Sequence, residues 1–348
     1  MVRLKDVAEA AGVSTTTVSH VINGTRRVSP ATRERVRNAV ARLGYRPDSI
    51  AQALKANRSR TIGMIVTSTN NPFFAGVIRG VEDGCFARGY SLVLCNADDV
   101  DDKQLAYLQT LRDKRIDGLV VMTSRNGPRF LDTLRDAYRV PTVFMDAAPG
   151  AEEDTAVVND DSRAGGRIGI EFLVGRGFRD IAVLTGPHDH PRSRERLAGA
   201  EAALAEAGVA LPDERVLATD LLMASGHRAM THLLGSAGRP EAVFAFNDLA
   251  AIGAIRAAAD QGLAVPTDIS VIGYDDVEIS RYLTPALTTV RQPIPALGQT
   301  AATVLLDRLD KGTPLPAQTR LAPELVIRDS VAWRDTARAR NQPPEPDA

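Results

Sequence analysis

The chain is poor in cysteine and in long apolar runs. Only Cys85 and Cys95 occur in 348 residues. Their spacing fits no zinc or redox motif, so a disulfide framework is excluded and buried free thiols are expected. No apolar stretch approaches the roughly 18 residues that span a bilayer, and the first residues lack the apolar core and cleavage site of a secretion signal. These absences predict a cytoplasmic protein without a membrane partner.

Signatures of enzymes are also lacking. There is no G-x-G-x-x-G after a strand, no P-loop, no His/Cys metal spacing and no nucleophile elbow. Gly165, Gly166 and Gly169 fall inside a predicted helix, where close packing is the better explanation for them. We therefore expect no catalytic residue, no cofactor and no metal, and the sequence favours a binding protein over an enzyme.

The net charge of −1 conceals a division along the chain. Residues 1–60 contain twelve Lys or Arg and four Asp or Glu, which gives +8, whereas the rest of the chain has 30 basic and 39 acidic residues, which gives −9. A small basic module on an acidic body is typical of a nucleic-acid binder whose second domain has another task. A merely solvated basic face would be the alternative if charge were the only signal.

Residues 4–23 fit a helix-turn-helix position by position. Ala8 stands where the two helices cross most closely, and Gly12 stands where the tight turn needs a left-handed backbone. The hydroxyl of Ser14 can cap the second helix. A generic pair of amphipathic helices would need neither that alanine, nor that glycine, nor that cap. The segment is therefore interpreted as a DNA-reading head.

The outward side chains of the second helix can reach the edges of bases. Thr15, Thr16 and His20 are polar and carry hydrogen-bonding groups, which suits readout in the major groove. For Thr17 and Ser19, phosphate contact or helix packing is the better interpretation. The first three residues are the candidate base readers.

A third helix is expected to begin at Ser29 and Pro30 and to run to about Leu43. With the run DVAEAAGVSTTTVSHVIN, followed by VSPATRERV and LGYRP, the head resembles that of the lactose-repressor (LacI/GalR) family, closest to its ribose-repressor and purine-repressor branches. The resemblance implies that the three candidate base readers touch bases and that Arg26 is a fourth reader.

Residues 47–57 are expected to form a short hinge helix with Ile50, Ala53 and Leu54 on one face. A helix below about 12–15 residues is not stable alone, so it must be stabilised by a partner. In the family that the head resembles, this helix pairs with its dimer mate in the minor groove. The resemblance implies that Leu54 wedges into the central base step beside Lys55 and kinks the duplex. The alternative is an inert linker with a buried leucine.

From Thr61 onward, apolar strand-like runs alternate with helical stretches. TIGMIVTS, YSLVLCN, DGLVVM and VPTVFMD form one series, and IAVLTGP, EAVFAF and ISVIGYD form another. Alternation at this spacing predicts α/β structure with doubly wound parallel sheets, and two series predict two lobes. Ligands of such folds bind at the carboxyl ends of strands, so residues that follow the strands should line a cleft between the lobes.

Polar and aromatic side chains follow these strands. Carboxylates, amides and arginine around two adjacent phenylalanines suit a sugar, because hydroxyls need paired donors and acceptors while C–H faces stack on rings. For a single residue, above all Asp146 or Asn247, a helix cap, a turn or a surface ion pair is the alternative. The residues after strands are Asn70 to Phe74, Asp146, Arg192, Arg194, Arg196, Asn247, Asp248 and Asp275, with Gln292 near the return crossover.

The body resembles the effector domain of the same family and the periplasmic ribose-binding protein, through NNPFF, RERLAG, NDLAAIGA, IGYDD and PALTTVRQP. Two departures matter, because Ala147 lacks the polar side chain that follows the aspartate of the ribose-binding protein, and Leu221 replaces an aromatic. His190, Arg192 and Leu222 are unlike the residues that grip a purine ring. A monosaccharide, with D-ribose first, is therefore the expected effector, and a purine corepressor is the alternative. The resemblance implies these ligand contacts: Asn71, Phe73, Phe74, Asp146, Arg196, Asn247, Asp275 and Gln292.

Four segments are expected along the chain. They are a helix-turn-helix head (1–46), a hinge helix and linker (47–60), a periplasmic-binding-protein-like effector-binding and dimerisation domain (61–335) and a disordered tail (336–348). The N-lobe is expected at about 61–160 and 291–322, and the C-lobe at about 161–290 and 323–335. The tail has no leucine heptads, so no tetramerising helix is expected.

These features predict a nucleoid-associated homodimeric repressor on a near-palindromic operator. Ligand would close the lobes and change how the paired hinge helices fold. In the sugar branch of the family ligand usually releases DNA, whereas in the purine branch it promotes binding, and the sequence leaves the sign open. The alternative from another class is a sugar-binding module of a transport system, against which the head and the lack of an export signal both argue.

Overall fold

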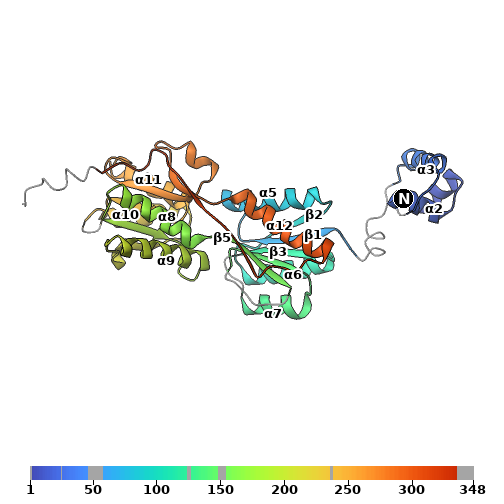
Figure 1. Ribbon diagram of the computed structural model, residues 1–348, viewed down its shortest axis with the longest axis horizontal. Coiled ribbons are helices and arrows are strands. Elements are labelled where there is room, and N and C mark those ends of the chain that lie inside the picture. The colour runs from blue at the N-terminus through green and yellow to red at the C-terminus, as the bar shows by residue number, and fades with distance from the viewer. Residues whose placement is uncertain are drawn as a thin grey trace, which may run out of the picture. The chain divides into compact units, whose positions relative to one another are not determined.

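The structure is a computed structural model that describes residues 2–24, 26–45, 58–123, 127–147, 154–235 and 238–334. Its internal contacts divide the chain into two units, Met1–Ser59 and Arg60–Ala348 (Figure 1). The predicted hinge helix, with Leu54 and Lys55, and the predicted tail lie outside the described residues. No helix in the described part of the chain is long and apolar enough to cross a membrane.

The first unit is a bundle of α1 (Leu4–Ala11), α2 (Thr15–Asn23) and α3 (Pro30–Leu43). The turn after α1 forms as predicted, because Gly12 has φ 60°, a left-handed conformation that glycine adopts without strain. The hydroxyl of Ser14 accepts a hydrogen bond from the amide of Thr17 at 3.1 Å and caps α2. The small core of the bundle consists of Val7, Ala8, Ala11, Val18, Val36 and Ala39.

The second unit contains two six-stranded sheets, each the centre of one lobe. The N-lobe sheet has the order β11-β5-β4-β3-β1-β2, and all its pairs are parallel. Its strands are β1 (Thr61–Val66), β2 (Ser91–Asn96), β3 (Gly118–Met122), β4 (Thr142–Met145), β5 (Thr155–Asp160) and β11 (Gln318–Leu321).

The C-lobe sheet has the order β12-β10-β9-β8-β6-β7, and only its edge strand β12 is antiparallel to its neighbour. The chain passes between the lobes after β5, after β10 and after β11. The strands are β6 (Ile181–Thr185), β7 (Val216–Ala218), β8 (Ala242–Ala245), β9 (Ser270–Asp275), β10 (Thr288–Arg291) and β12 (Glu324–Val326).

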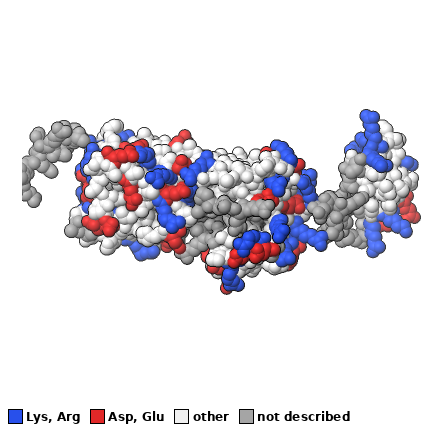
Figure 2. Space-filling model, turned by 60° about the horizontal axis from the view of Figure 1, so that its bottom comes forward, with Lys and Arg blue, Asp and Glu red and all other residues white. Residues whose placement is uncertain are grey.

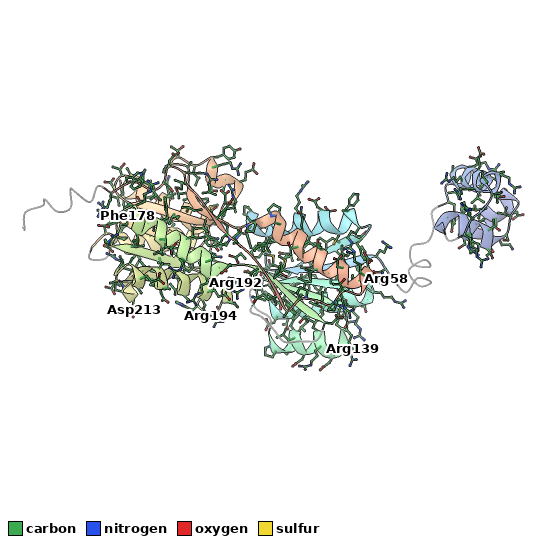
Figure 3. The ribbon with its side chains drawn as sticks, in the orientation of Figure 1. Arg58, Arg139, Phe178, Arg192, Arg194 and Asp213 are labelled. Carbon is green, nitrogen blue, oxygen red and sulfur yellow. The ribbon has the colours of Figure 1, made fainter. Side chains whose placement is uncertain are left out.

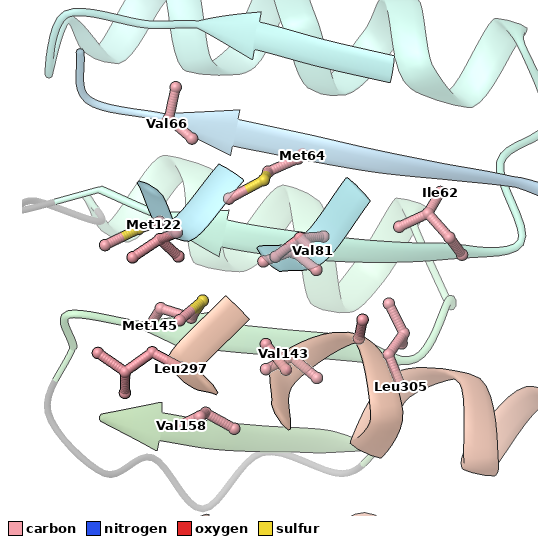
Figure 4. Packing of buried hydrophobic residues seen from close by; sticks show 14 of the residues in the cluster. Ile62, Met64, Val66, Val81, Met122, Val143, Met145, Val158, Leu297 and Leu305 are labelled. Carbon is pink, nitrogen blue, oxygen red and sulfur yellow. The ribbon is translucent and has the colours of Figure 1, made fainter. Parts of the chain in front are cut away.

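Helices cover both faces of each sheet. On the N-lobe, α5 packs beside α12 on one face and α6 beside α7 on the other, and Figure 4 shows side chains of β1, β3, β4 and β5 packed against α5 and α12. On the C-lobe, α8 packs beside α9 and α10 beside α11. The bounds are α5 (Pro72–Ala87), α6 (Asp101–Asp113), α7 (Pro128–Ala137), α8 (Ser162–Gly175), α9 (Pro191–Glu206), α10 (Met223–Gly235), α11 (Asp248–Asp260) and α12 (Ile294–Lys311), with short 3-10 turns at η1 (Asp213–Arg215) and η2 (Glu278–Arg281).

The predicted architecture is confirmed, and the two cysteines are free and buried as expected. The sequence analysis missed five strands, β5, β7, β10, β11 and β12. Three of them, β7, β11 and β12, are edge strands of three or four residues without a fully buried face, so they lack the apolar run that marked the others.

The glycines in α8 lie at close contacts, as the sequence predicts. A methyl group on Gly166 would overlap the carbonyl oxygen of Arg196 in α9, and one on Gly199 would overlap the carbonyl oxygen of Arg163 in α8. A methyl group on Gly169 would lie 2.7 Å from the ring of Phe244. The two helices therefore approach each other backbone to backbone, which places the first turns of α9 against the start of α8.

We expect Gly166→Ala to destabilise the body by about 1–3 kcal/mol, because the backbone of α9 must shift to admit the methyl group. Gly175→Ala in the same helix is the matched control, since nothing lies within 4 Å of the added carbon. It should be neutral or stabilise by up to about 1 kcal/mol. Urea unfolding of the two variants checks this, and equal midpoints would contradict it.

Candidate functional site

A cavity of about 450 Å³ lies between the two lobes, within the range of small-molecule sites. It is lined by residues at the carboxyl ends of strands in both sheets, where two parallel sheets present their loops to each other. All the ligand contacts that the sequence predicts line this cavity: Asn71, Phe73, Phe74, Asp146, Arg196, Asn247, Asp275 and Gln292.

An aromatic pair stands at the start of α5. The rings of Phe73 and Phe74 meet edge to face, with centroids 5.4 Å apart and planes at 67°. The side-chain oxygen of Asn71 accepts a hydrogen bond from the amide of Phe73 at 2.9 Å, so Asn71 caps the helix. The cap fixes the start of α5, from which both rings line the cavity. The NH₂ group of Asn71 is not used in the cap.

A strained turn carries Asp275. Its φ is 111° and that of Asp276 is 57°, both in the left-handed region that non-glycine residues rarely adopt. The carboxylate of Asp248 holds this turn, because it accepts hydrogen bonds from the amide of Val277 at 2.8 Å and from the hydroxyl of Thr289 at 2.6 Å. A buried acid thus fixes the direction of a second acid that lines the cavity.

Asp275 is almost completely buried, and Gln292 donates a hydrogen bond from Nε2 to its Oδ1 at 2.7 Å. Burial raises the pKa of Asp275 well above its ordinary value, although the charge of Arg196 and the hydrogen bond from Gln292 act in the opposite direction. This hydrogen bond fixes the orientation of both side chains. The second carboxyl oxygen of Asp275 and the side-chain carbonyl oxygen of Gln292 are then in place to accept hydrogen bonds from ligand hydroxyls.

The guanidinium of Arg196 forms part of the C-lobe wall. Its central carbon lies 3.3 Å from the ring centroid of Tyr274. It donates hydrogen bonds to the carbonyl oxygen of Phe246 and, at 3.3 Å, to the hydroxyl of Ser162. Asp160 lies 4.0 Å away and accepts from the hydroxyl of Tyr274 at 2.6 Å. Nε of Arg196 is buried and has no hydrogen-bond partner among the described residues.

Asp146 and His190 form a polar bridge between the lobes. Asp146 follows β4 of the N-lobe, and its Oδ2 lies 3.2 Å from Nε2 of His190, the residue that caps α9 of the C-lobe. Burial acts to raise the pKa of Asp146, but the charge and hydrogen bond of His190, with Arg192 and Arg196, lower it below its ordinary value. A ligand that binds Asp146 must share or replace this contact.

Sequence analysis left His190 and Arg192 out of the set of contacts, although both line the cavity. Arg192 is 3% exposed and donates from Nη1 to the carbonyl oxygen of Asp160 at 3.4 Å. Arg194 lies two residues later and is exposed, so the two point to different sides of α9 (Figure 3). Helical periodicity applied to the three arginines of this helix would have separated them.

For Asn247 the alternative role of a helix cap is realised. Its Oδ1 accepts from the amide of Ala250 at 2.9 Å, and its Nδ2 donates to the carbonyl oxygen of Leu221 at 2.8 Å. The side chain still borders the cavity, but both of its polar ends already have partners. Its contribution is therefore largely to hold the start of α11 against the loop of Leu221.

In the head, Thr15 and Thr16 are exposed at the start of α2, His20 is partly exposed, and Arg26 is exposed beyond its end. The hydroxyl of Thr17 lies 2.9 Å from that of Ser14, which fits the packing role assigned to it. The surface that α2 presents is polar and carries hydrogen-bonding groups, as base readout requires. Contact of these side chains with DNA stays a prediction.

A helix-turn-helix head and a two-lobed α/β body with a polar internal cavity together define a DNA-binding regulator that responds to a small ligand. Residues 3–48 match the family model of bacterial regulatory proteins, lacI family, and residues 170–331 match the periplasmic binding protein-like domain. The HTH-type transcriptional repressor PurR of Erwinia tasmaniensis is 46% identical over 341 residues, which are 97% of this chain and 100% of that protein.

Solved structures agree with these matches. The lac repressor dimer bound to operator and the anti-inducer ONPF is 32% identical, with a TM-score of 0.87, covering 95% of this chain and 99% of that one. A LacI family regulator from Enterococcus faecium with bound ribose is 31% identical, with a TM-score of 0.70, covering 79% and 100%. The chain belongs to the lacI family and is a DNA-binding transcriptional repressor, which confirms the resemblance seen in its head.

The buried Asp248 should make stability depend on pH. Burial raises its pKa to about 7, although hydrogen bonds from Thr289 and Val277 lower it. In the unfolded chain an aspartate ionises near pH 4, so between about pH 4 and 7 the folded chain binds the proton more tightly. The free energy of unfolding should therefore fall as pH rises through this window.

In Asp248→Asn this contribution is absent, so the fall from pH 5 to pH 8 should be smaller than in the parent by about 2–4 kcal/mol. Urea unfolding at four or five pH values measures the difference between the two proteins. Parallel profiles would show that the carboxyl of Asp248 does not titrate in this range in the folded state.

Proposed function

We propose that a monosaccharide, with D-ribose as the first candidate, binds between the lobes and controls the affinity of this repressor for its operator. The observation that carries the proposal is the chemistry of the cavity. The carboxyl groups of Asp146 and Asp275 and the guanidinium of Arg196 line the same cavity as the ring pair of Phe73 and Phe74. Neighbouring hydroxyls suit such paired acceptors and donors, and the C–H face of a sugar suits the rings.

A relative supports this choice of ligand. The Enterococcus faecium regulator, similar over 79% of this chain, was solved with bound ribose. Ribose belongs to the class of ligand that the cavity chemistry favours here. Leu221, which stands where related proteins have an aromatic residue, and the exposed Leu222 line the cavity beside Asp220.

A purine corepressor is the second candidate. Curated relatives that are 44–46% identical over 95–97% of the chain carry the name PurR, and a planar base could also lie against Phe73 and Phe74. The two candidates predict opposite effects of ligand on operator affinity. By analogy with the two branches of the family, a sugar would release operator DNA, whereas a purine would promote binding.

The bridge between Asp146 and His190 gives the ligand a means to act. A ligand that takes over Asp146 removes one of the contacts that join the lobes and adds its own, so the preferred angle between the lobes changes. A difference in free energy of about 1–3 kcal/mol between the two lobe arrangements would change operator affinity about 5–150-fold. Two heads in a dimer would read the two halves of a near-palindromic operator.

The ligand can be identified by thermal unfolding with pentoses, hexoses, purine bases and nucleosides. A true ligand at 100 times its dissociation constant should stabilise the protein by about 2.7 kcal/mol. We expect ribose or a related monosaccharide to do so, and Asp275→Asn to abolish the shift while the variant without ligand unfolds as the parent does. Stabilisation by a purine alone would replace the first candidate with the second.

Base reading and ligand binding should be separable by mutation. His20→Ala should weaken operator binding about 10-fold or more, since a lost base contact costs about 1–3 kcal/mol, and should spare ligand binding. Asp275→Asn should do the reverse. Operator titrations by fluorescence anisotropy and ligand titrations by calorimetry measure both, and variants that behave like the parent in both assays would refute the site assignment.

A further inference from the structure

The N-lobe is electrically polarised along its strands. Aspartates lie at the carboxyl ends of β2, β4 and β5, on the side of the cavity, whereas basic side chains precede β1 to β4 at the amino ends, where Asp117 and Asp154 also lie. The acidic residues are Asp98, Asp99, Asp101, Asp102, Asp146, Asp160 and Asp161. The basic residues are Arg58 and Arg60 before β1, Arg88 before β2, Arg112, Lys114 and Arg115 before β3, and Arg139 before β4. We call this second set the amino edge.

The parallel order of β1 to β4 brings these cations to one end of the lobe, because strands that run the same way begin at the same edge. Arg58 and Arg139, 81 positions apart in the sequence, lie at this end in Figure 3. Figure 2 shows Lys and Arg side chains at this end of the lobe, with Asp and Glu side chains among them. The amino edge is thus a product of the sheet topology, and it opposes the net charge of −9 outside residues 1–60.

Much of this positive charge is not neutralised locally. Arg112, Lys114, Arg115 and Arg139 are exposed, and among the described residues none of the four side chains has an ion pair or a hydrogen bond. Arg88 differs, because it pairs with Asp307 and Asp310 of α12.

The acidic residues of the same edge already have other partners. Asp117 accepts a hydrogen bond from the amide of Arg60 at 2.7 Å, and Asp113 accepts one from Gln109 at 3.0 Å. Asp136 pairs with Arg135 at 3.0 Å. Asp113 and Asp117 keep their negative charge in these hydrogen bonds, but the basic residues of the amino edge outnumber these aspartates, and an excess of exposed positive charge favours a polyanionic partner.

The path of the chain indicates which polyanion this is. The body begins at the amino edge, because Arg58 and Arg60 lead directly into β1, and the DNA-reading head precedes them in the sequence. Tyr45, the last described residue of the head, is 13 residues before Arg58, a connection that spans at most about 45 Å even when fully extended. The connection to the DNA-reading head therefore joins the body at the amino ends of the strands and not at their carboxyl ends.

We infer that the amino edge of the N-lobe sheet is a second DNA-contacting surface, which binds backbone phosphates of the duplex that the head occupies. Lysine and arginine bind phosphates by charge and hydrogen bonds and release counterions from the duplex, without reading bases. The surface thus adds affinity and salt dependence but no sequence preference. With the function proposed above, in which ligand changes the angle between the lobes, this surface would also make the N-lobe a direct contributor to DNA affinity.

The test compares two full-length triple variants with the parent. One is Lys114→Gln/Arg115→Gln/Arg139→Gln on the amino edge. The matched control is Arg163→Gln/Arg194→Gln/Arg239→Gln, which removes three exposed arginines of the C-lobe that likewise have no ion pair or side-chain hydrogen bond among the described residues. Both variants lose three positive charges. A difference in their DNA affinity therefore reports where on the protein the charges were removed and not the change in net charge.

Each protein is titrated with duplex DNA carrying the operator and flanking sequence, and with a scrambled duplex, over a series of salt concentrations. Each lost phosphate contact should reduce the slope of log affinity against log salt concentration by about 0.9. We expect the amino-edge variant to lose at least one such step, to bind operator about 10-fold more weakly at low salt and to keep its preference for operator over scrambled DNA, while the control keeps the slope of the parent.

Equal slopes for the amino-edge variant and the control would overturn the inference. A reduced preference for the operator in the amino-edge variant would also overturn it, since phosphate contacts carry no base information. Thermal unfolding checks that both variants are folded. Failure of the parent itself to distinguish operator from scrambled DNA would refute the DNA-reading role of the head and is a different result from either of these.

Discussion

The ligand site depends on how the protein compensates the charge of one buried guanidinium, that of Arg196. A charge taken out of water costs several kcal/mol unless it is paired and hydrogen-bonded. Arg196 meets that cost through the ring of Tyr274, the carbonyl oxygen of Phe246 and Asp160 nearby. Tyr274 belongs to β9, Phe246 follows β8 and Asp160 ends β5, so compensation of one charge ties two strands of the C-lobe to the crossover from the N-lobe.

The glycines of α8 are part of the same arrangement. Arg196 reaches its partners only because α9 lies backbone to backbone against α8, and the hydrogen atom of Gly166 faces the carbonyl oxygen of Arg196 itself. A larger side chain there would move the whole first half of α9, which carries His190 at its cap and Arg192 in its first turn. Packing and ligand chemistry are therefore not independent in this lobe.

In the proposed mechanism the two ends of the N-lobe sheet have different roles, one at the ligand cavity and one at the proposed DNA-contacting surface. At the carboxyl ends of the strands, Asp99 and Asp146 border the cavity, and at the amino ends exposed cations such as Lys114 and Arg139 face solvent. A parallel sheet keeps the two sets apart, because all its strands begin at one edge and end at the other. In the proposed mechanism a change in lobe angle at the cavity would also move the opposite edge of the sheet, which would link ligand binding to the proposed DNA-contacting surface.

Most of the ligand-site residues were predictable because their positions follow from strand ends, a rule that needs only the alternation of strands and helices. Phe73, Asp146 and Asp275 were found in this way and all line the cavity. The rule could not show that the polar ends of Asn247 are already taken by the cap of α11 and the loop of Leu221, because that loop lies 26 positions earlier in the chain. It also had no means of finding the short edge strands, which lack a buried face.

The sequence by itself determined the local features of this protein. The turn at Gly12, the cap at Ser14 and the helix that begins at Pro30 depend on a few neighbouring residues, so they can be read from a short window. Only the tertiary structure decided that Asp146 meets His190, 44 positions away on the other lobe. The physical reason is that capping and turn formation are set by residues within one helical turn, whereas the neutralisation of buried charge depends on which distant segments the fold brings together.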